Sequence, residues 1–138
     1  MIPTMHKADG IGLAAPQVHV AKQLAVLEAK HDARAERPIP LTILINPRIV
    51  AASKTIVEDW EGCLSVNDLR GRVPRAEWVD VETFNRKGER VKFHAQGFLA
   101  RVIQHECDHL VGKVFLDRLP NLATLCHLQE FVRYWQHG

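Results

Sequence analysis

The sequence predicts an α+β fold, in which mostly antiparallel strands surround one central helix and a further helix lies at the C-terminal end. Short segments rich in β-branched and aliphatic residues alternate with turn residues, which is typical of antiparallel strands. Residues 98–110 instead carry apolar side chains three and four positions apart, the spacing of a helix with one buried face. Residues 121–137 repeat that spacing. The length of 138 residues suits one domain with its own core.

The expected strands follow one another along the first two thirds of the chain. Residues 1–9 suit the end of a helix that Gly10 stops, and GIGLAAPQ at 10–17 suits a loop of small residues. Residues 31–40 are polar and contain proline, so they predict another loop. We predict strands over 23–29, 41–47, 54–65, 77–84 and 89–95, with 54–65 becoming irregular towards its end. NRKG, between the last two segments, predicts a hairpin turn.

Two helices complete the prediction. Gly97 precedes the central helix, and Gly112 follows it, where glycine commonly ends a helix. Asn121 can cap the C-terminal helix. We expect six residues on the inner side of that helix: Leu122, Leu125, Leu128, Phe131, Val132 and Trp135.

Composition narrows the classes of function. The 46% hydrophobic and 25% charged residues are typical of a globular protein. A net charge of +2, with scattered Lys and Arg, argues against direct nucleic-acid recognition. No apolar run approaches the ~18 residues of a membrane span, and the first residues do not resemble a secretion signal. We therefore expect a cytoplasmic protein without a membrane partner. Three cysteines favour free thiols or a metal ligand over a disulfide framework.

The segment QHECDHL at 104–110 contains the pattern H-E-x-x-H. His105 and His109 lie four positions apart, so a helix places both imidazoles on one face, where they can hold one metal ion. Glu106 is then placed to act as a general base and later as a proton donor. A catalytic site of this kind normally takes three ligands from the protein, so one ligand remains to be found.

Three positions compete for the third ligand. The pattern that continues to a third histidine fails, because that position is Phe115. Glu130, 21 residues after His109, could supply a carboxylate as in some metallopeptidases, and it stays open as an alternative. Cys63, in EGCLS at 61–65, lies at the end of a strand-like segment and would complete the Cys/His₂ set of catalytic zinc sites. We favour Cys63.

Three segments together resemble the signature motifs of the peptide deformylase family: GIGLAAPQ at 10–17, EGCLS at 61–65 and QHECDHLVG at 104–112. VPRAE at 73–77 is also similar to the family. The resemblance extends from residue 1 to about residue 119. It implies a metal-dependent hydrolase that removes the formyl group from N-formylmethionyl nascent peptides at the ribosome and releases formate.

The resemblance also implies roles for individual residues. The metal ligands would be Cys63, His105 and His109, with water as the fourth ligand. Fe(II) is the expected natural metal, with Zn, Ni or Co possible in purified protein. Glu106 would be the general acid and base, Gln17 and the backbone N–H of Leu64 would hold the oxyanion, and the backbone of Gly12 would pair with the substrate.

The methionine side chain of such a substrate needs an apolar pocket. The candidates are Ile11, Leu64, Phe98 and Val102, with the ring of His105. Arg70 is a candidate for contact with the substrate backbone.

Other residues are expected to support the site from outside it. The residues alone leave Asp108 as either a solvated carboxylate or a partner of Arg75, and the resemblance implies the ion pair. We also expect hydrogen bonds from Glu61 and Gln104 that hold the ligand segments. Cys107 is interpreted as a buried thiol, and Arg101 as a surface arginine.

The chain departs from the family at its start, because only nine residues precede Gly10. We therefore expect residues 1–138 to form a single deformylase-like catalytic domain that lacks the family's usual N-terminal lead. Two alternatives remain: a metal-binding relative with impaired catalysis, and a metallopeptidase that uses Glu130. The sequence does not predict an oligomeric state.

Overall fold

The structure is a computed structural model that describes residues 1–136. The helices are α1 (Ile2–Lys7), α2 (Gly97–Leu110) and α3 (Leu128–Tyr134), with short 3₁₀ helices η1 (Ala15–Val18) and η2 (Phe115–Arg118). The strands are β1 (Gly12–Ala14), β2 (Leu24–Ala29), β3 (Ile39–Ala52), β4 (Ile56–Cys63), β5 (Val66–Ala76), β6 (Trp78–Phe84), β7 (Arg90–Gln96) and β8 (Cys126–His127). The α+β prediction is confirmed.

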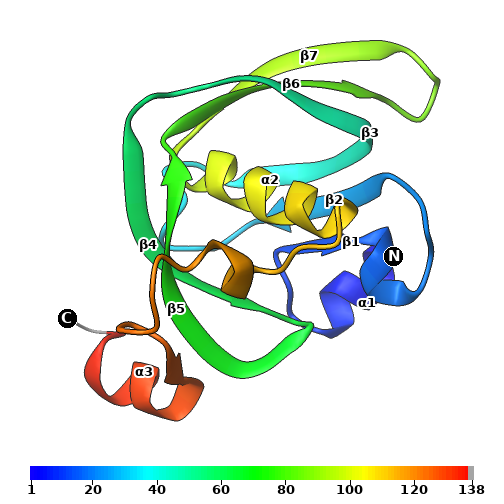
Figure 1. The fold of residues 1–138 in the computed structure, drawn as a ribbon. Helices are drawn as coiled ribbons and strands as arrows, with labels where there is room; N and C mark the ends of the chain where they lie inside the picture. The colour runs from blue at the N-terminus through cyan, green and yellow to red at the C-terminus, as the bar shows by residue number, and fades with distance from the viewer. Residues whose placement is uncertain (137–138) are drawn as a thin grey trace.

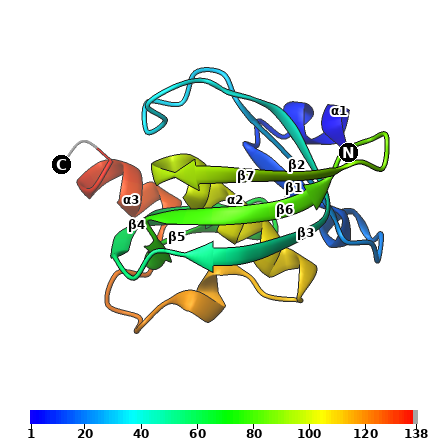
Figure 2. The ribbon, with the colours of Figure 1, turned by 90° about the horizontal axis from the view of Figure 1, so that it is seen from above.

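Two antiparallel sheets surround α2, which crosses the middle of the molecule (Figure 1). The larger sheet has the order β1-β2-β3-β6-β7, and the smaller one has the order β4-β5-β8. β3, β6 and β7 lie side by side along one side of α2 (Figure 2). The β6–β7 hairpin confirms the turn predicted at NRKG, with Gly88 at a φ of 80°. Within the described residues, no helix has the length and apolar character that crossing a membrane requires.

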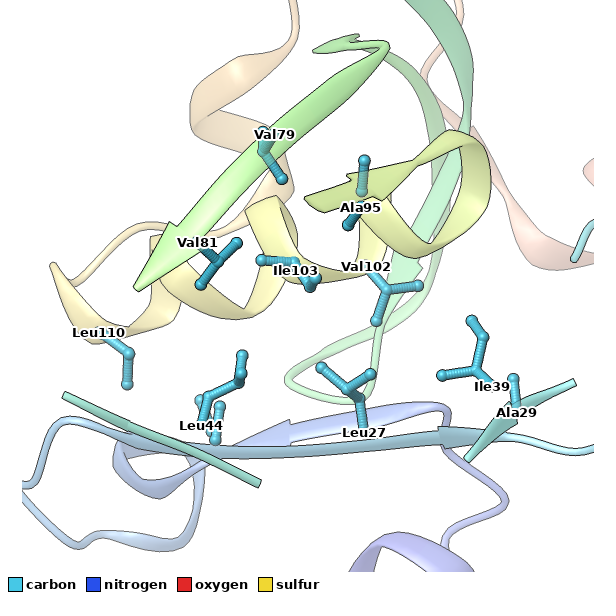
Figure 3. Packing of buried hydrophobic residues seen from close by; sticks show 13 residues of the cluster. Leu27, Ala29, Ile39, Leu44, Val79, Val81, Ala95, Val102, Ile103 and Leu110 are labelled. Carbon is cyan, nitrogen blue, oxygen red and sulfur yellow. The ribbon is translucent and has the colours of Figure 1, made fainter. Parts of the chain in front are cut away.

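The core forms where α2 packs against the larger sheet. Ile103 of α2 is fully buried, with Val79 and Val81 of β6 on one side and Leu27 and Leu44 on the other (Figure 3). Apolar side chains three and four positions apart on α2 therefore pack against the sheet. The polar side chains on the other face of the helix, including His105 and His109, do not take part in this packing. Gln104 further fixes α2 by hydrogen bonds to both the N–H and the C=O of Ala76, at 3.0 and 2.9 Å.

Strand β3 is longer than the sequence predicts. The predicted strand ends at Pro47, but β3 continues to Ala52. The pairing with β6 shifts register between Ile45 and Arg48, and Asn46 adopts a positive φ of 47°. Proline is tolerated at such a bulge because its missing N–H interrupts no regular ladder bond.

The C-terminal helix prediction is wrong in extent. α3 covers only Leu128–Tyr134, Leu122 is 74% exposed, and the predicted residue 137 lies outside the described residues. Residues of β8 instead pair with Leu69 and Arg70 at the outer edge of β5, so a tertiary contact overrides the helical spacing. Two of the predicted inner residues contact another aromatic ring: Phe131 and Trp135 lie 5.0 and 5.6 Å from Trp60, between ring centroids.

Candidate metal centre and active site

Cys63, His105 and His109 come together beside α2. Cys63 is the last residue of β4, and the two histidines lie one turn apart on the helix. Their potential ligand atoms all lie within 4.8 Å of one another. Cys63 Sγ is 3.4 Å from His109 Nε2. The structure therefore brings together the three residues that the sequence predicted as metal ligands.

The local fold of β4 and β5 presents the Cys63 thiol to the helix. Cys63 pairs with Val66 across a tight turn, and the ladder shifts register between Glu61 and Cys63. Gly62 lies within this irregularity, and the Arg70 guanidinium covers it: a Cβ on Gly62 would lie 2.6 Å from Arg70 Nε. A side chain at position 62 would therefore displace the Arg70 guanidinium.

Hydrogen bonds orient the His105 ring and lower the pKa of the Cys63 thiol. His105 Nδ1 lies 2.8 Å from Glu61 Oε1, which leaves Nε2 free for a metal. Burial raises the pKa of the Cys63 thiol, but hydrogen bonds from His105 and His109 outweigh it and lower the value to about 6. The donor set of one thiolate and two imidazoles suits Zn or Fe(II). The residues present therefore fit a divalent metal.

Glu106 is buried, 4% exposed, and lies against Gly12. A Cβ on Gly12 would lie only 2.7 Å from the carboxyl carbon of Glu106, so the absence of a side chain makes room for this carboxylate. Burial raises the pKa of Glu106 to about 7. Among the described residues, its Oε2 is the only buried side-chain polar atom without a hydrogen-bond partner. A buried oxygen of this kind suits a bound water or substrate group.

Gln17 is held in a fixed orientation next to Cys63. Its Oε1 accepts a hydrogen bond from the Ala14 N–H at 2.9 Å, which directs the amide nitrogen towards the β4–β5 turn. That nitrogen donates to Ser65 Oγ at 2.9 Å and to Cys63 Sγ at 3.6 Å. Leu64, between Cys63 and Ser65, is 43% exposed. The side-chain amide of Gln17 and the turn that carries Leu64 are therefore neighbours.

Three of the candidate pocket residues, Ile11, Phe98 and Val102, belong to one apolar cluster, whereas Leu64 lies outside it. Val102 is part of the buried core, and both Ile11 and Phe98 pack against that core while remaining partly exposed. The Arg34 guanidinium lies 4.4 Å from the centre of the Phe98 ring, a contact that the sequence gave no reason to expect. An apolar surface thus runs from the loop before β1 to the first turns of α2.

A buried group of charged residues supports the ligands. The expected Asp108–Arg75 pair is present at 2.6 Å, and Arg118, which is exposed and lies outside this buried group, bonds to the other side of Asp108. Arg75 makes a two-point pair with Glu61, 2.9 Å at each bond. Although burial raises the pKa of Glu61, hydrogen bonds from His105 and Arg75 lower it to about 2.

Arg101 corrects the sequence-based interpretation. It is 6% exposed rather than a surface residue, and its Nη1 lies 2.7 Å from Glu61 Oε2. The signal that could have identified it is its spacing of four residues from His105, which places both on one helix face. Cys107, expected to be a buried thiol, is only partly buried and lies outside the metal cluster, and burial raises the pKa of its thiol to about 12.

Glu130 does not join the metal cluster. It is exposed in the first turn of α3. Among residues 1–136, the one group of three or more His, Cys, Asp or Glu that could hold a metal ion contains Cys63 and the two histidines. The structure therefore gives Glu130 no support as a third ligand.

Known proteins resemble this chain in both sequence and fold. The family model of polypeptide deformylase matches residues 1–124. Peptide deformylase 1 of Bordetella pertussis is 44% identical over 125 residues, covering 89% of this chain and 71% of the relative. Peptide deformylase of Roseiflexus castenholzii is 45% identical, covering 94% and 75%. A peptide deformylase structure from Acinetobacter baumannii superimposes with a TM-score of 0.82 at 40% identity, covering 86% and 76%. The chain therefore belongs to the polypeptide deformylase family.

Proposed function

We propose that Cys63, His105 and His109 hold one divalent metal ion, and that Glu106 transfers protons while the chain removes the N-formyl group from nascent peptides. Removal of the formyl group is the reaction of the family. The observation that carries the assignment of residues is the cluster of one thiol and two imidazoles, with ligand atoms within 4.8 Å of one another. When bound, the ion lowers the pKa of a water and polarises a carbonyl oxygen.

Glu106 performs the proton transfers in this proposal. Its Oε2 has no partner among the described residues, so it can accept the proton of the attacking water. The same oxygen then delivers that proton to the leaving amine as the C–N bond of the formamide breaks, and formate departs. Contact with Gly12 keeps the carboxylate in place through both steps.

Gln17 and the turn after Cys63 stabilise the developing oxyanion. The Gln17 amide nitrogen lies next to Cys63, and its orientation is fixed by the bond from Ala14 N–H to Oε1. The backbone N–H of Leu64 is the second donor. Donors that are already in place when the charge develops lower the barrier, and losing one typically costs about 10²–10³ in rate.

The substrate peptide lies along β1. This strand is at one edge of the larger sheet, so its outer side is available to an extended peptide. The backbone of Gly12 pairs with the peptide, and the methionine side chain enters the apolar surface of Ile11, Phe98 and Val102, with Leu64 at its border. Arg70, which covers Gly62, contacts the peptide backbone further along.

The proposed substrate class follows from a relative. The Acinetobacter baumannii structure has Met-Ala-Ser bound, the peptide that deformylation of formyl-Met-Ala-Ser would leave. We extend this to N-formylmethionyl nascent chains at the ribosome, and therefore to a cytoplasmic location. Fe(II) is the proposed metal in the cell, with Zn, Ni or Co in purified protein. Residues 1–138 act as one catalytic domain, because β8 and α3 pack on β4 and β5.

Formate release and metal content test this proposal together. Protein purified without oxygen should contain one metal ion per chain and release formate from formyl-Met-Ala-Ser. Cys63→Ala should lose both metal and activity. Cys126→Ala is the matched control, because Cys126 is a partly buried thiol of β8 outside the cluster, and it should keep both.

Metal content and formate release can each contradict a different part of the proposal. A Cys63→Ala protein that keeps a full complement of metal would refute the ligand assignment. Full metal with no formate release in the unaltered chain would instead indicate a metal-binding relative with impaired catalysis.

A further inference from the structure

We infer that Arg101 is a positioning residue for the metal site: it fixes the Glu61 carboxylate, which in turn fixes the ring of His105. The inference rests on the proposed metal site, because His105 is one of its ligands. The residue acts through two hydrogen bonds in series. Arg101 Nη1 lies 2.7 Å from Glu61 Oε2, and Glu61 Oε1 lies 2.8 Å from His105 Nδ1.

The first argument is that Glu61 has more cationic partners than a structural pair needs. Arg75 alone bonds both oxygens of Glu61, at 2.9 Å each, which completes a two-point ion pair. A second buried arginine next to the same carboxylate adds an unfavourable charge unless it has a further role. Placing Oε1 against His105 is such a role, because it requires the carboxylate to be held against rotation.

The second argument is the register on α2. Arg101, His105 and His109 are spaced by four residues, so they form one line along the helix. Glu61, from β4, bonds to both of the first two. The two bonds therefore use opposite oxygens of one carboxylate, so it cannot turn without breaking one of them.

The third argument is that Arg101 itself is anchored to both strands of the β4–β5 hairpin. Its Nη1 also donates to the Val73 carbonyl of β5 at 2.8 Å, and its Nη2 donates to the Val57 carbonyl of β4 at 2.6 Å. A planar guanidinium with several fixed donors makes these bonds together, which a lysine ammonium cannot do in the same geometry. Arg101 therefore anchors the Glu61 carboxylate to the backbone of the β4–β5 hairpin, whose turn follows Cys63.

The test measures the metal site rather than turnover. Arg101→Met, Arg101→Gln and Arg101→Lys are compared with the unaltered chain after loading with Co(II), whose visible absorption reports ligand geometry. The rate of Co(II) loss to an excess of chelator is the second measurement. Arg118→Met is the matched control, because Arg118 bonds to Asp108 of the same charged group and has no bond to Glu61.

Replacing a residue that hydrogen-bonds a metal ligand typically lowers the affinity for the metal 10–100-fold. Since Arg75 remains in place, we expect about tenfold faster Co(II) loss and an altered visible spectrum for Arg101→Met and Arg101→Gln. Arg101→Lys keeps a cation next to Glu61 Oε2 but loses the carbonyl bonds to Val57 and Val73, so its spectrum and its rate of Co(II) loss should lie between those of the unaltered chain and those of Arg101→Met. Arg118→Met should show neither change.

A role in stability alone predicts a different pattern. It predicts that Arg101→Lys, which loses the carbonyl bonds to Val57 and Val73, unfolds as easily as Arg101→Met while both keep the native spectrum and the native rate of Co(II) loss. That result overturns the inference. If Arg101→Met does not fold, Arg101→Gln decides by the same two measurements. Failure of the unaltered chain to bind Co(II) would instead contradict the proposed metal site, so the two failures are distinguishable.

Discussion

Gly12→Ala tests the placement of the general base without altering any polar group. Gly12 lies in β1, and its φ is not in the left-handed region, so alanine fits its backbone. The added Cβ would lie 2.7 Å from the carboxyl carbon of Glu106 and 2.9 Å from Cγ, where ordinary contact begins at 3.4 Å. Because a flexible side chain yields more easily than backbone, Glu106 moves and β1 stays.

The size of the effect follows from that displacement. The carboxyl carbon must retreat by more than half an ångström, and the nearer oxygen by about 1 Å, a misplacement that can cost about 10² in rate. We expect kcat to fall by about 10²-fold, which corresponds to about 2.7 kcal/mol of barrier. KM should change little, because the backbone N–H and C=O of residue 12 remain available to the peptide.

The assay is formate release from formyl-Met-Ala-Ser over a range of concentrations, with metal content and thermal unfolding measured on the same samples. Gly71→Ala is the control. Its Cβ would meet the end of the Leu119 side chain at 2.8 Å, a comparable clash on β5 that does not involve Glu106. The control should keep its kcat. If Gly12→Ala turned over within threefold of the unaltered chain, the position of Glu106 would not control the rate.

Three further predictions use the same preparations. Glu106→Gln should keep its metal but lose about 10²–10⁴ in kcat, because the amide cannot accept the proton; wild-type turnover would exclude it as the base. Gln17→Glu keeps an acceptor oxygen but loses the N–H donor, so kcat should fall about 10²–10³ at unchanged metal content, and an effect on KM alone would contradict this role. Arg75→Met leaves two buried acids without their shared partner and should cost about 3–5 kcal/mol in urea unfolding. The exposed Arg48–Glu82 pair is its control, since Arg48→Met should cost no more than about 1 kcal/mol.

The sequence predicts best what local spacing determines. The apolar residues of α2 repeat at helical intervals, so both the helix and the common face of His105 and His109 follow from sequence. Cys63 was harder to predict, because a lone cysteine is most often a small buried residue. Selecting Cys63 requires two further observations, the Cys/His₂ ligand set of known zinc sites and the surrounding motif EGCLS. In the structure, Cys63 Sγ lies 3.4 Å from His109 Nε2.

The structural features that the sequence does not predict depend on contacts between residues far apart along the chain. Arg101 is buried because Glu61 and the Val73 carbonyl lie next to it, and these are 40 and 28 residues away. The sequence does not predict strand β5, because the buried face of this strand carries the charged Arg75 and the segment contains Gly71 and Pro74. The C-terminal segment keeps a helical spacing through Leu125, but free backbone groups on β5 draw Cys126 and His127 into a strand.

The sequence separations within the charged group have a consequence for how the protein folds. Glu61 and Arg75 are 14 residues apart on one hairpin, so their pair can form early while water still surrounds it. Arg101 and Asp108 reach that pair only when α2 docks, from separations of 40 and 33 residues. Docking then removes every one of these charges from water in one step, and a partly docked helix would leave buried charges uncompensated. Refolding should therefore show metal-binding competence returning in the same kinetic phase as core packing, with the late step set by this long-range contact.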